Sequence, residues 1–101
     1  LVDFIYIAMH GQFAEDGRLQ GMLEILQIPY LGSGVFASAL RMDKIAQKLF
    51  LTQAGIQVPS YITIPASYQL QNSDAIIQEI NRNQLGFPCI VKPYNEGSSL
   101  G

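Results

Sequence analysis

The chain has 101 residues, of which 49% are hydrophobic and 14% are charged, and its formal net charge is -2. This length suits one domain rather than two, and the apolar content excludes a disordered chain. Six Lys and Arg residues are too few and too scattered for a general grip on nucleic acid, and no apolar run is long enough to span a membrane. A single cysteine, Cys89, excludes an internal disulfide, fits a reducing cytoplasm, and leaves no Cys/His cluster to hold a metal.

Strand-like and helix-like segments alternate in the first half of the chain. Residues 2–9 crowd β-branched and aromatic side chains together, which predicts a buried strand. A polar loop at 10–17 follows, and apolar side chains at helical spacing then predict a helix over 18–27, which Pro29 ends. After a short extended piece and a glycine turn, residues 35–54 carry the longest helical pattern.

The second half continues the alternation. It predicts a strand at 61–64, a helix over about 73–84 and a strand at 89–92. This order is typical of an α/β chain with at least part of a parallel sheet. We place the domain boundary between about residues 41 and 60, where one α/β unit closes and a proline-bounded strand begins the next. The chain is accordingly divided into residues 1–41 and 42–101.

The sequence at both ends of the chain predicts that the chain is a segment of a longer protein. The chain opens inside the strand predicted at 2–9 without an initiator Met, and it stops in a small-residue loop at 95–101 that would normally connect two elements. We therefore expect a chain cut at both ends. The alternative is a small natural domain with frayed termini, although domains seldom begin in a core strand.

The loop at 10–17 is the first candidate site, because open α/β sheets bind ligands beyond the carboxyl ends of their strands. His10 can donate a hydrogen bond or a proton, and Glu15 can orient it or a substrate ammonium. The alternative is a capping loop, with Glu15 and Asp16 near the N-terminus of the next helix and Gly11 serving the backbone. The residues alone favour capping for the two acidic side chains and leave His10 undecided.

Two further sets of residues are candidates for phosphate binding. Arg41, Lys44 and Lys48 share one face of the predicted long helix, where a lysine can contact a phosphate, although periodicity alone favours a solvated face. Lys92 ends the last predicted strand, and the loop at 93–101 is rich in glycine and serine. Backbone N–H groups of such loops contact oxyanions, but the glycine spacing matches neither a Walker A loop nor a dinucleotide fingerprint. For Lys92 and the loop at 93–101, phosphate binding is narrowly favoured over the alternative of a hairpin loop whose lysine side chain extends into water.

Taken together, these stretches resemble the D-alanine–D-alanine ligase family. The resemblance rests on motifs that follow one another along nearly the whole chain: His10-Gly11, Glu15-Asp16-Gly17, Gln20–Glu24, Ile28–Gly34, Ala37–Leu40, Met42–Lys44, Gly86–Pro88, Val91–Pro93 and Glu96–Gly101. The match is weakest at 60–85. Ala14 stands where the family usually has glycine, so the loop around it is expected to be slightly stiffer.

The resemblance implies an ATP-grasp enzyme. The chain would form the second half of the N-terminal α/β (pre-ATP-grasp) domain and the start of the central ATP-grasp domain, incomplete at both ends. The family joins two D-alanines for peptidoglycan precursors. ATP phosphorylates the first carboxylate, and the second amine attacks the acyl phosphate. The 101-residue chain alone is expected to be inactive and to bind ATP poorly.

The resemblance implies that Lys44 and Lys92 contact the phosphates of ATP. Arg41 and Lys48 are still expected to lie on a solvated face of the long helix. Glu96, Gly97 and Ser99 belong to a loop that would close over the triphosphate. The stretches around these residues and around the first loop would therefore converge on one cleft.

The same resemblance assigns the catalytic centre. Ser98 would join the hydrogen bonds near the first D-alanine, and His10 would lie beside that substrate and the acyl phosphate. Gly11 and Glu15 would shape the substrate loop, with Glu15 supporting the loop rather than touching substrate. Mg²⁺ would accompany ATP, with its acidic ligands beyond residue 101, so no metal ligand is expected in this chain.

The implied partners are ATP and D-alanine in a cytoplasmic homodimer, without nucleic acid or membrane. Two alternatives remain. One is another ATP-grasp ligase that joins a carboxylate to an amine. The other is a non-catalytic α/β module that self-associates through an exposed strand edge. The sequence also leaves D-alanine and D-lactate open as the second substrate.

Overall fold

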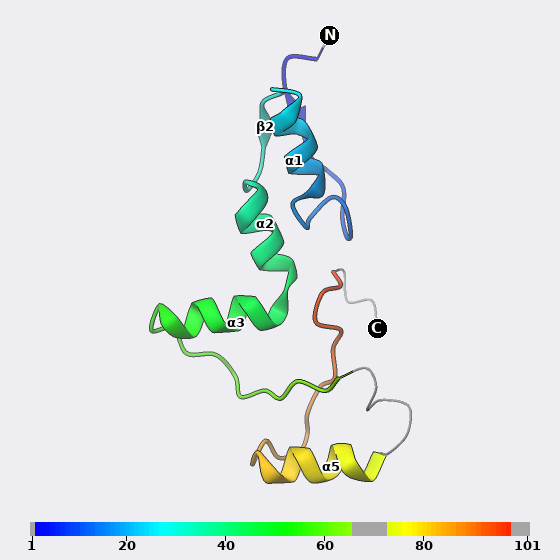
Figure 1. Cartoon of the computed structure of the whole chain (residues 1–101), viewed down its shortest axis with the longest axis vertical. Helices are drawn as coiled ribbons and strands as arrows, with labels where there is room; N and C mark the ends of the chain where they lie inside the picture. The colour runs from blue at the N-terminus through cyan, green and yellow to red at the C-terminus, as the bar shows by residue number, and fades with distance from the viewer. Residues whose placement is uncertain (1, 66–72, 98–101) are drawn as a thin grey trace. The chain divides into compact units, whose positions relative to one another are not determined.

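The computed structural model describes residues 2–65 and 73–97, which contain four helices and two short strands. In chain order these elements are β1 (Ile5–Tyr6), α1 (Arg18–Ile25), β2 (Tyr30–Leu31), α2 (Val35–Met42), α3 (Lys44–Gln53) and α5 (Ser73–Arg82), as Figure 1 shows. The chain divides into two compact units. Unit 1 comprises residues 1–56 and 92–101, and unit 2 comprises residues 57–91.

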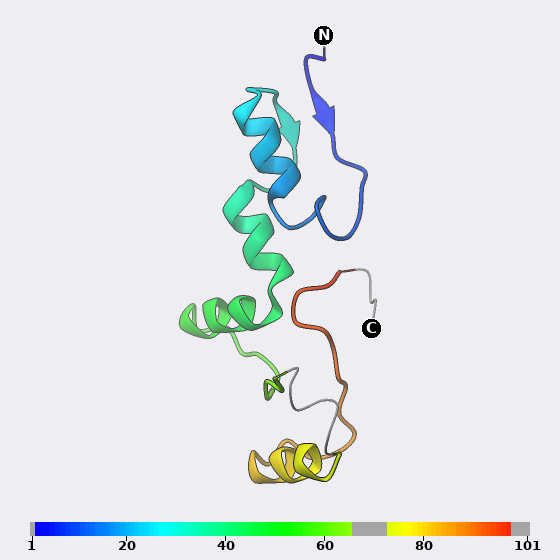
Figure 2. The ribbon, with the colours of Figure 1, turned by 45° about the vertical axis from the view of Figure 1, so that its right-hand side comes forward.

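In unit 1, β1 and β2 form a parallel pair connected through α1. Ile5 lies opposite Tyr30 and Tyr6 opposite Leu31 (Figure 2), and the Ile5 N–H donates to Pro29 O at 2.9 Å. A parallel pair needs a crossover, and α1 supplies it. The predicted β–α–β alternation is therefore confirmed here, although the strand predicted over 2–9 pairs at only two residues.

Helix α1 begins at a glycine that no other residue could replace without strain. Gly17 has a φ of 92°, and a Cβ at this position would lie 2.7 Å from Val35 O. Glycine alone adopts this conformation readily and also lets the backbones approach so closely. The start of α1 is thereby fixed against the start of α2, directly after the loop at 10–17.

The single helix predicted over 35–54 is wrong, because Asp43 divides it into α2 and α3. Asp43 has an extended backbone (φ -88°, ψ 102°), and its Oδ1 accepts hydrogen bonds from the N–H groups of Ile45 and Ala46, each at 2.9 Å. A carboxylate in this position satisfies N–H groups that a new helix leaves without partners. The two helices stay in contact through the rings of Phe36 and Phe50, whose centroids are 5.9 Å apart in an edge-to-face arrangement.

The strands predicted at 61–64 and 89–92 are also not formed. Both segments have irregular backbone, and the sheet that the structure describes contains β1 and β2 alone. Ile90 and Val91 are 81% and 72% exposed. A strand is held by hydrogen bonds to a neighbour, and β-branched composition does not supply that neighbour.

Unit 2 contains α5, which matches the helix predicted over about 73–84. Asp74 lies in its first turn and Arg82 in its last, each at the end where its charge complements the helix dipole. Ile80 is the buried side chain of this helix, 5% exposed. None of the helices in the described ranges is long and apolar enough to cross a membrane.

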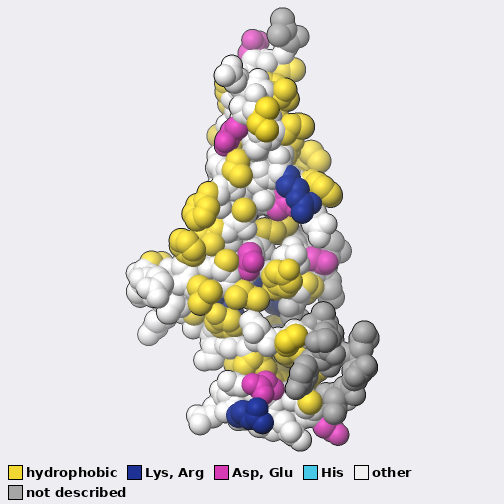
Figure 3. All heavy atoms as spheres, in the orientation of Figure 1, with side chains coloured by type: hydrophobic (Ala, Val, Ile, Leu, Met, Phe, Trp, Pro, Cys, Tyr) yellow, Lys and Arg dark blue, Asp and Glu magenta, His cyan; other side chains and the backbone are white. Residues whose placement is uncertain are grey.

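Few hydrophobic side chains are buried. Leu23 of α1 is 1% exposed and Ala14 2%, whereas Ile25 at the end of the same helix is 84% exposed. Hydrophobic side chains are visible over much of the face drawn in Figure 3. The apolar stripes that predict the helices are thus only partly covered within the described residues.

Candidate functional site

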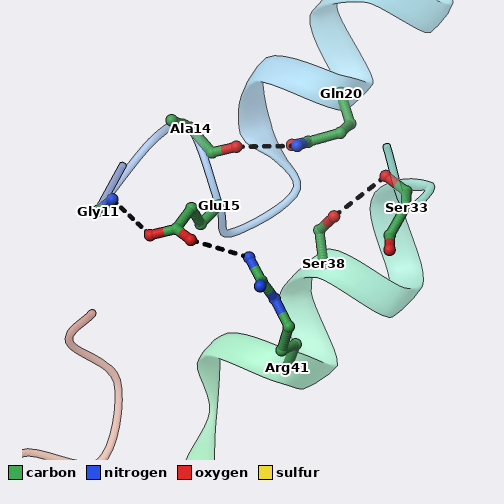
Figure 4. Close-up of polar contacts among 7 residues, drawn as sticks. All are labelled: Gly11, Ala14, Glu15, Gln20, Ser33, Ser38 and Arg41. Carbon is green, nitrogen blue, oxygen red and sulfur yellow. Dashed lines mark hydrogen bonds and ion pairs between the residues drawn. The ribbon is translucent and has the colours of Figure 1, made fainter. Parts of the chain in front are cut away.

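The first loop, named here the His10 loop (residues 10–17), is organised around the carboxylate of Glu15. The Gly11 N–H donates to Glu15 Oε2 at 2.6 Å, and the Glu15 N–H donates back to Gly11 O at 3.0 Å. The other carboxylate oxygen, Oε1, accepts a hydrogen bond from Arg41 Nη2 at 3.0 Å (Figure 4). Glu15 therefore closes the loop on itself and ties it to α2.

Asp16 fixes the exit from the same loop. Its Oδ2 accepts the Phe13 N–H at 2.9 Å, and its Oδ1 accepts the Arg18 N–H at 3.1 Å, at the first residue of α1. Asp16 thus accepts one backbone N–H group at the start of α1, whereas Glu15 supports the loop itself. Phe13 has a φ of 70°, which only a well-held loop imposes on a non-glycine residue.

Two buried polar side chains fix the elements beside this loop. Gln20 Nε2 of α1 donates to Ala14 O at 2.8 Å, and Ser38 Oγ of α2 donates to Ser33 O at 3.1 Å (Figure 4). Gln20 is 4% exposed and Ser38 3%. Both hydrogen bonds bridge a helix and the turn before it, so the His10 loop rests on a rigid support.

Both acidic side chains of the loop have a lowered pKa. For Glu15 the largest cause is the hydrogen bond from the Gly11 N–H, and the charge of Arg41 adds to it against an opposing effect of burial. For Asp16, burial is the largest single effect and raises the pKa, but the N–H donors of Phe13 and Arg18 outweigh it. Both groups are therefore held as carboxylates.

Lys44 connects the start of α3 to a second loop near the end of the chain, named here the Glu96 loop (residues 93–97). Its backbone N–H donates to Tyr94 O at 2.8 Å. Its ammonium Nζ donates to Pro93 O at 2.8 Å and to Glu96 O at 2.7 Å. Lys44 is half-buried, and two of its three ammonium donors hold this loop.

Gly97 brings the Glu96 loop against the His10 loop. A Cβ at Gly97 would lie 3.3 Å from Glu15 Oε2, 3.3 Å from Met42 Cε and 3.6 Å from Gly11 Cα. The three stretches around Gly11, Lys44 and Gly97 are thus neighbours within unit 1.

The remaining predicted site residues make fewer contacts within the described part of the chain. His10 and Lys92 are exposed, and neither makes a hydrogen bond or ion pair with another residue in the described ranges. His10 is still close enough for its charge to contribute to lowering the pKa of Glu15. Ser98 and Ser99 lie outside the described residues. The contacts of all these residues with substrate or ATP stay predictions.

The interpretation of Arg41 as a solvated cation agrees with its exposure but leaves out an ion pair. Its side chain is 59% exposed, but its guanidinium forms the ion pair with Glu15, 26 residues earlier in the chain. Helical periodicity could not find this pair, because the partner is in a loop and the break at Asp43 separates Arg41 from the helix of Lys44. Lys48 is half-buried rather than fully solvated.

The site residues do not form a magnesium site by themselves. The described ranges contain no group of three His, Cys, Asp or Glu side chains that could hold a metal ion. Each oxygen of the Glu15 carboxylate accepts one hydrogen bond, from the Gly11 N–H and from Arg41.

Comparison with known proteins identifies the architecture. The model for the D-ala D-ala ligase N-terminus matches residues 1–33, and the model for the D-ala D-ala ligase C-terminus matches residues 50–101. The α/β chain thus matches one model in its first third and the other in its second half. The chain belongs to the D-alanine–D-alanine ligase family, and the predicted fold class is confirmed. The boundary after residue 41 lies between the two matches and stays a prediction.

Individual relatives agree with the family. The D-alanine–D-alanine ligase of Geobacillus kaustophilus is 45% identical over 100 residues, which are 99% of this chain and 27% of that protein. The structure of the VanG D-Ala:D-Ser ligase from Enterococcus faecalis matches 97% of this chain and 27% of its own, with 39% identity and a TM-score of 0.78. The D-alanine–D-alanine ligase of Bacillus anthracis, solved in complex with ATP, matches 92% of this chain and 30% of its own, with 39% identity and a TM-score of 0.74. The chain therefore spans less than a third of the length of these relatives.

Proposed function

We propose that this chain supplies part of the ATP and donor-substrate site of an ATP-dependent ligase that joins two D-alanines for peptidoglycan synthesis. The observation that carries this proposal is the convergence of the His10 loop, Lys44 and the Glu96 loop within unit 1. Family membership supports the reaction, and the ATP complex of the Bacillus anthracis ligase supports the nucleotide.

In the proposed reaction, a carboxylate oxygen of the first D-alanine attacks the terminal phosphorus of ATP, and ADP leaves with the electrons of the broken bond. The amine of the second D-alanine then attacks the acyl carbon, loses a proton and expels phosphate. Catalysis of phosphoryl transfer depends on positioning and on cations near the developing charge.

The residues of this chain have distinct roles in the proposal. Lys44 holds the Glu96 loop with two ammonium donors and directs the third to a phosphate oxygen. Lys92 supplies a second cation, and the loop that includes Gly97 and Ser99 covers the phosphates. His10 and Ser98 contact the first D-alanine and the acyl phosphate.

Some features belong to the complete ligase rather than to this chain. Mg²⁺ is proposed to bind with ATP, and it takes no ligand from the described residues. We also propose a cytoplasmic homodimer. The alternatives of another ATP-grasp ligase and of a non-catalytic module are distinguished from this proposal by the products formed.

A second candidate for the acceptor substrate is D-serine. The observation in its favour is the likeness to the VanG D-Ala:D-Ser ligase. Product analysis with D-alanine alone, with D-alanine plus D-serine and with D-alanine plus D-lactate separates the three acceptors.

The test is a grafted ligase, in which this chain replaces the matching segment of the Geobacillus kaustophilus enzyme. We expect ADP release that depends on D-alanine, with D-alanyl-D-alanine as product. Lys92→Ala should lower kcat by about a hundredfold, since it removes a cation from the transferring phosphoryl group. The matched variant Lys48→Ala, to which no phosphate contact is assigned, should change kcat by less than about twofold. An inactive graft, or equal losses in the two variants, would contradict the proposal.

A further inference from the structure

Arg41 is a cation beside the site to which the expected reaction assigns no role. It lies in the last turn of α2, and its guanidinium is 3.0 Å from Glu15 Oε1. The Glu15 side chain is 23% exposed and the Arg41 side chain 59%, so the pair is at the edge of the site rather than in a core. The close-up in Figure 4 shows the Arg41 side chain extending from α2 toward the Glu15 carboxylate.

The partner of Arg41 occupies the junction of two loops. Glu15 Oε2 accepts a hydrogen bond of 2.6 Å from the N–H of Gly11, the residue directly after His10. The same oxygen would lie 3.3 Å from a Cβ at Gly97, which shows how closely the Glu96 loop approaches. A rotation of the Glu15 side chain would therefore disturb both loops at once.

Arg41 restricts that rotation. A glutamate side chain has several rotamers, and one hydrogen bond from Gly11 leaves the opposite carboxylate oxygen unrestrained. The guanidinium fixes Oε1 from a helix whose start is itself anchored by the buried Ser38. The position of the His10 loop is thus fixed by α2 as well as by the loop's own backbone.

We infer that Arg41 is a positioning residue that, through Glu15, fixes the His10–Gly11 turn against Gly97 and so sets the binding of the first D-amino acid. This inference rests on the proposed function for its substrate. An exposed ion pair contributes little to folding stability. Loss of Arg41 should therefore appear in substrate binding and loop dynamics rather than in unfolding.

Steady-state kinetics of the grafted ligase tests the inference. Arg41→Ala should raise the KM of the first D-alanine about tenfold, because small misplacements of binding groups have large effects, and should leave the KM of ATP within about twofold. Arg41→Lys should restore most of the loss, since an ammonium can still pair with Glu15. The control Arg82→Ala removes an exposed ion pair of similar length (3.1 Å) in α5 and should change neither constant.

A double-variant cycle separates action through Glu15 from an independent effect. If Arg41 acts through Glu15, the Glu15→Ala, Arg41→Ala enzyme should have the same KM for the first D-alanine as Glu15→Ala alone. The inference would be overturned if the effects of the two substitutions on this KM multiplied in the double variant, or if Arg41→Ala left the KM unchanged.

Amide hydrogen exchange keeps the inference testable when the graft is inactive, an outcome that would count against the proposed function instead. In the 101-residue chain, the Gly11 N–H should exchange about tenfold faster in Arg41→Ala than in the wild type, because its acceptor is less restrained. Arg82→Ala should leave this rate unchanged. Equal Gly11 exchange in wild type and Arg41→Ala would refute the positioning role.

Discussion

At the scale of single residues, the carboxylate of Glu15 is the group on which the His10 loop depends, and its lowered pKa gives the loop a defined pH response. The folded pKa lies below the ordinary value of 4.5, chiefly because of the Gly11 N–H. The stabilisation is therefore complete above about pH 4.5 and is lost as the pH falls through the folded pKa. Urea unfolding should show wild type losing more stability than Glu15→Gln as the pH falls below about 4.5, since glutamine does not titrate. Equal losses would mean that the carboxylate does not hold the loop.

At the scale of elements, the division between α2 and α3 depends on Asp43. Its Oδ1 accepts two backbone N–H groups at the start of α3, and the next residue, Lys44, begins that helix and holds the Glu96 loop. Asp43→Ala should cost about 0.5–2 kcal/mol in the free energy of unfolding, the usual loss for an N-cap. Asp43→Asn keeps an acceptor oxygen and should lose much less. Urea unfolding of the 101-residue chain measures both, and an Asp43→Ala variant as stable as the wild type would show that the cap contributes nothing.

The same elements show what the sequence could predict. Helical spacing located α1 and α5, and it covered α2 and α3 together, but it did not reveal the break at Asp43, because the apolar pattern continues on both sides. The strands at 61–64 and 89–92 were expected from composition, and composition says nothing about a hydrogen-bonding neighbour. Motif resemblance placed Gly11, Lys44 and Gly97 at one site. It could not reveal Arg41, whose partner depends on how a loop folds back on a helix.

At the scale of the whole molecule, the exposed hydrophobic side chains predict self-association of the 101-residue chain. Ile25 is 84% exposed at the end of α1, Tyr6 of β1 is 70% exposed, and Leu31 of β2 is 57% exposed. Exposed apolar side chains and unpaired strand edges both favour contact between copies. Light scattering after size-exclusion chromatography should give a mean mass that rises with protein concentration. Ile25→Lys, which places a charge on this surface outside the site, should shift that rise to higher concentration. A monomeric mass at every concentration would contradict the prediction and would show that these side chains tolerate water without a partner.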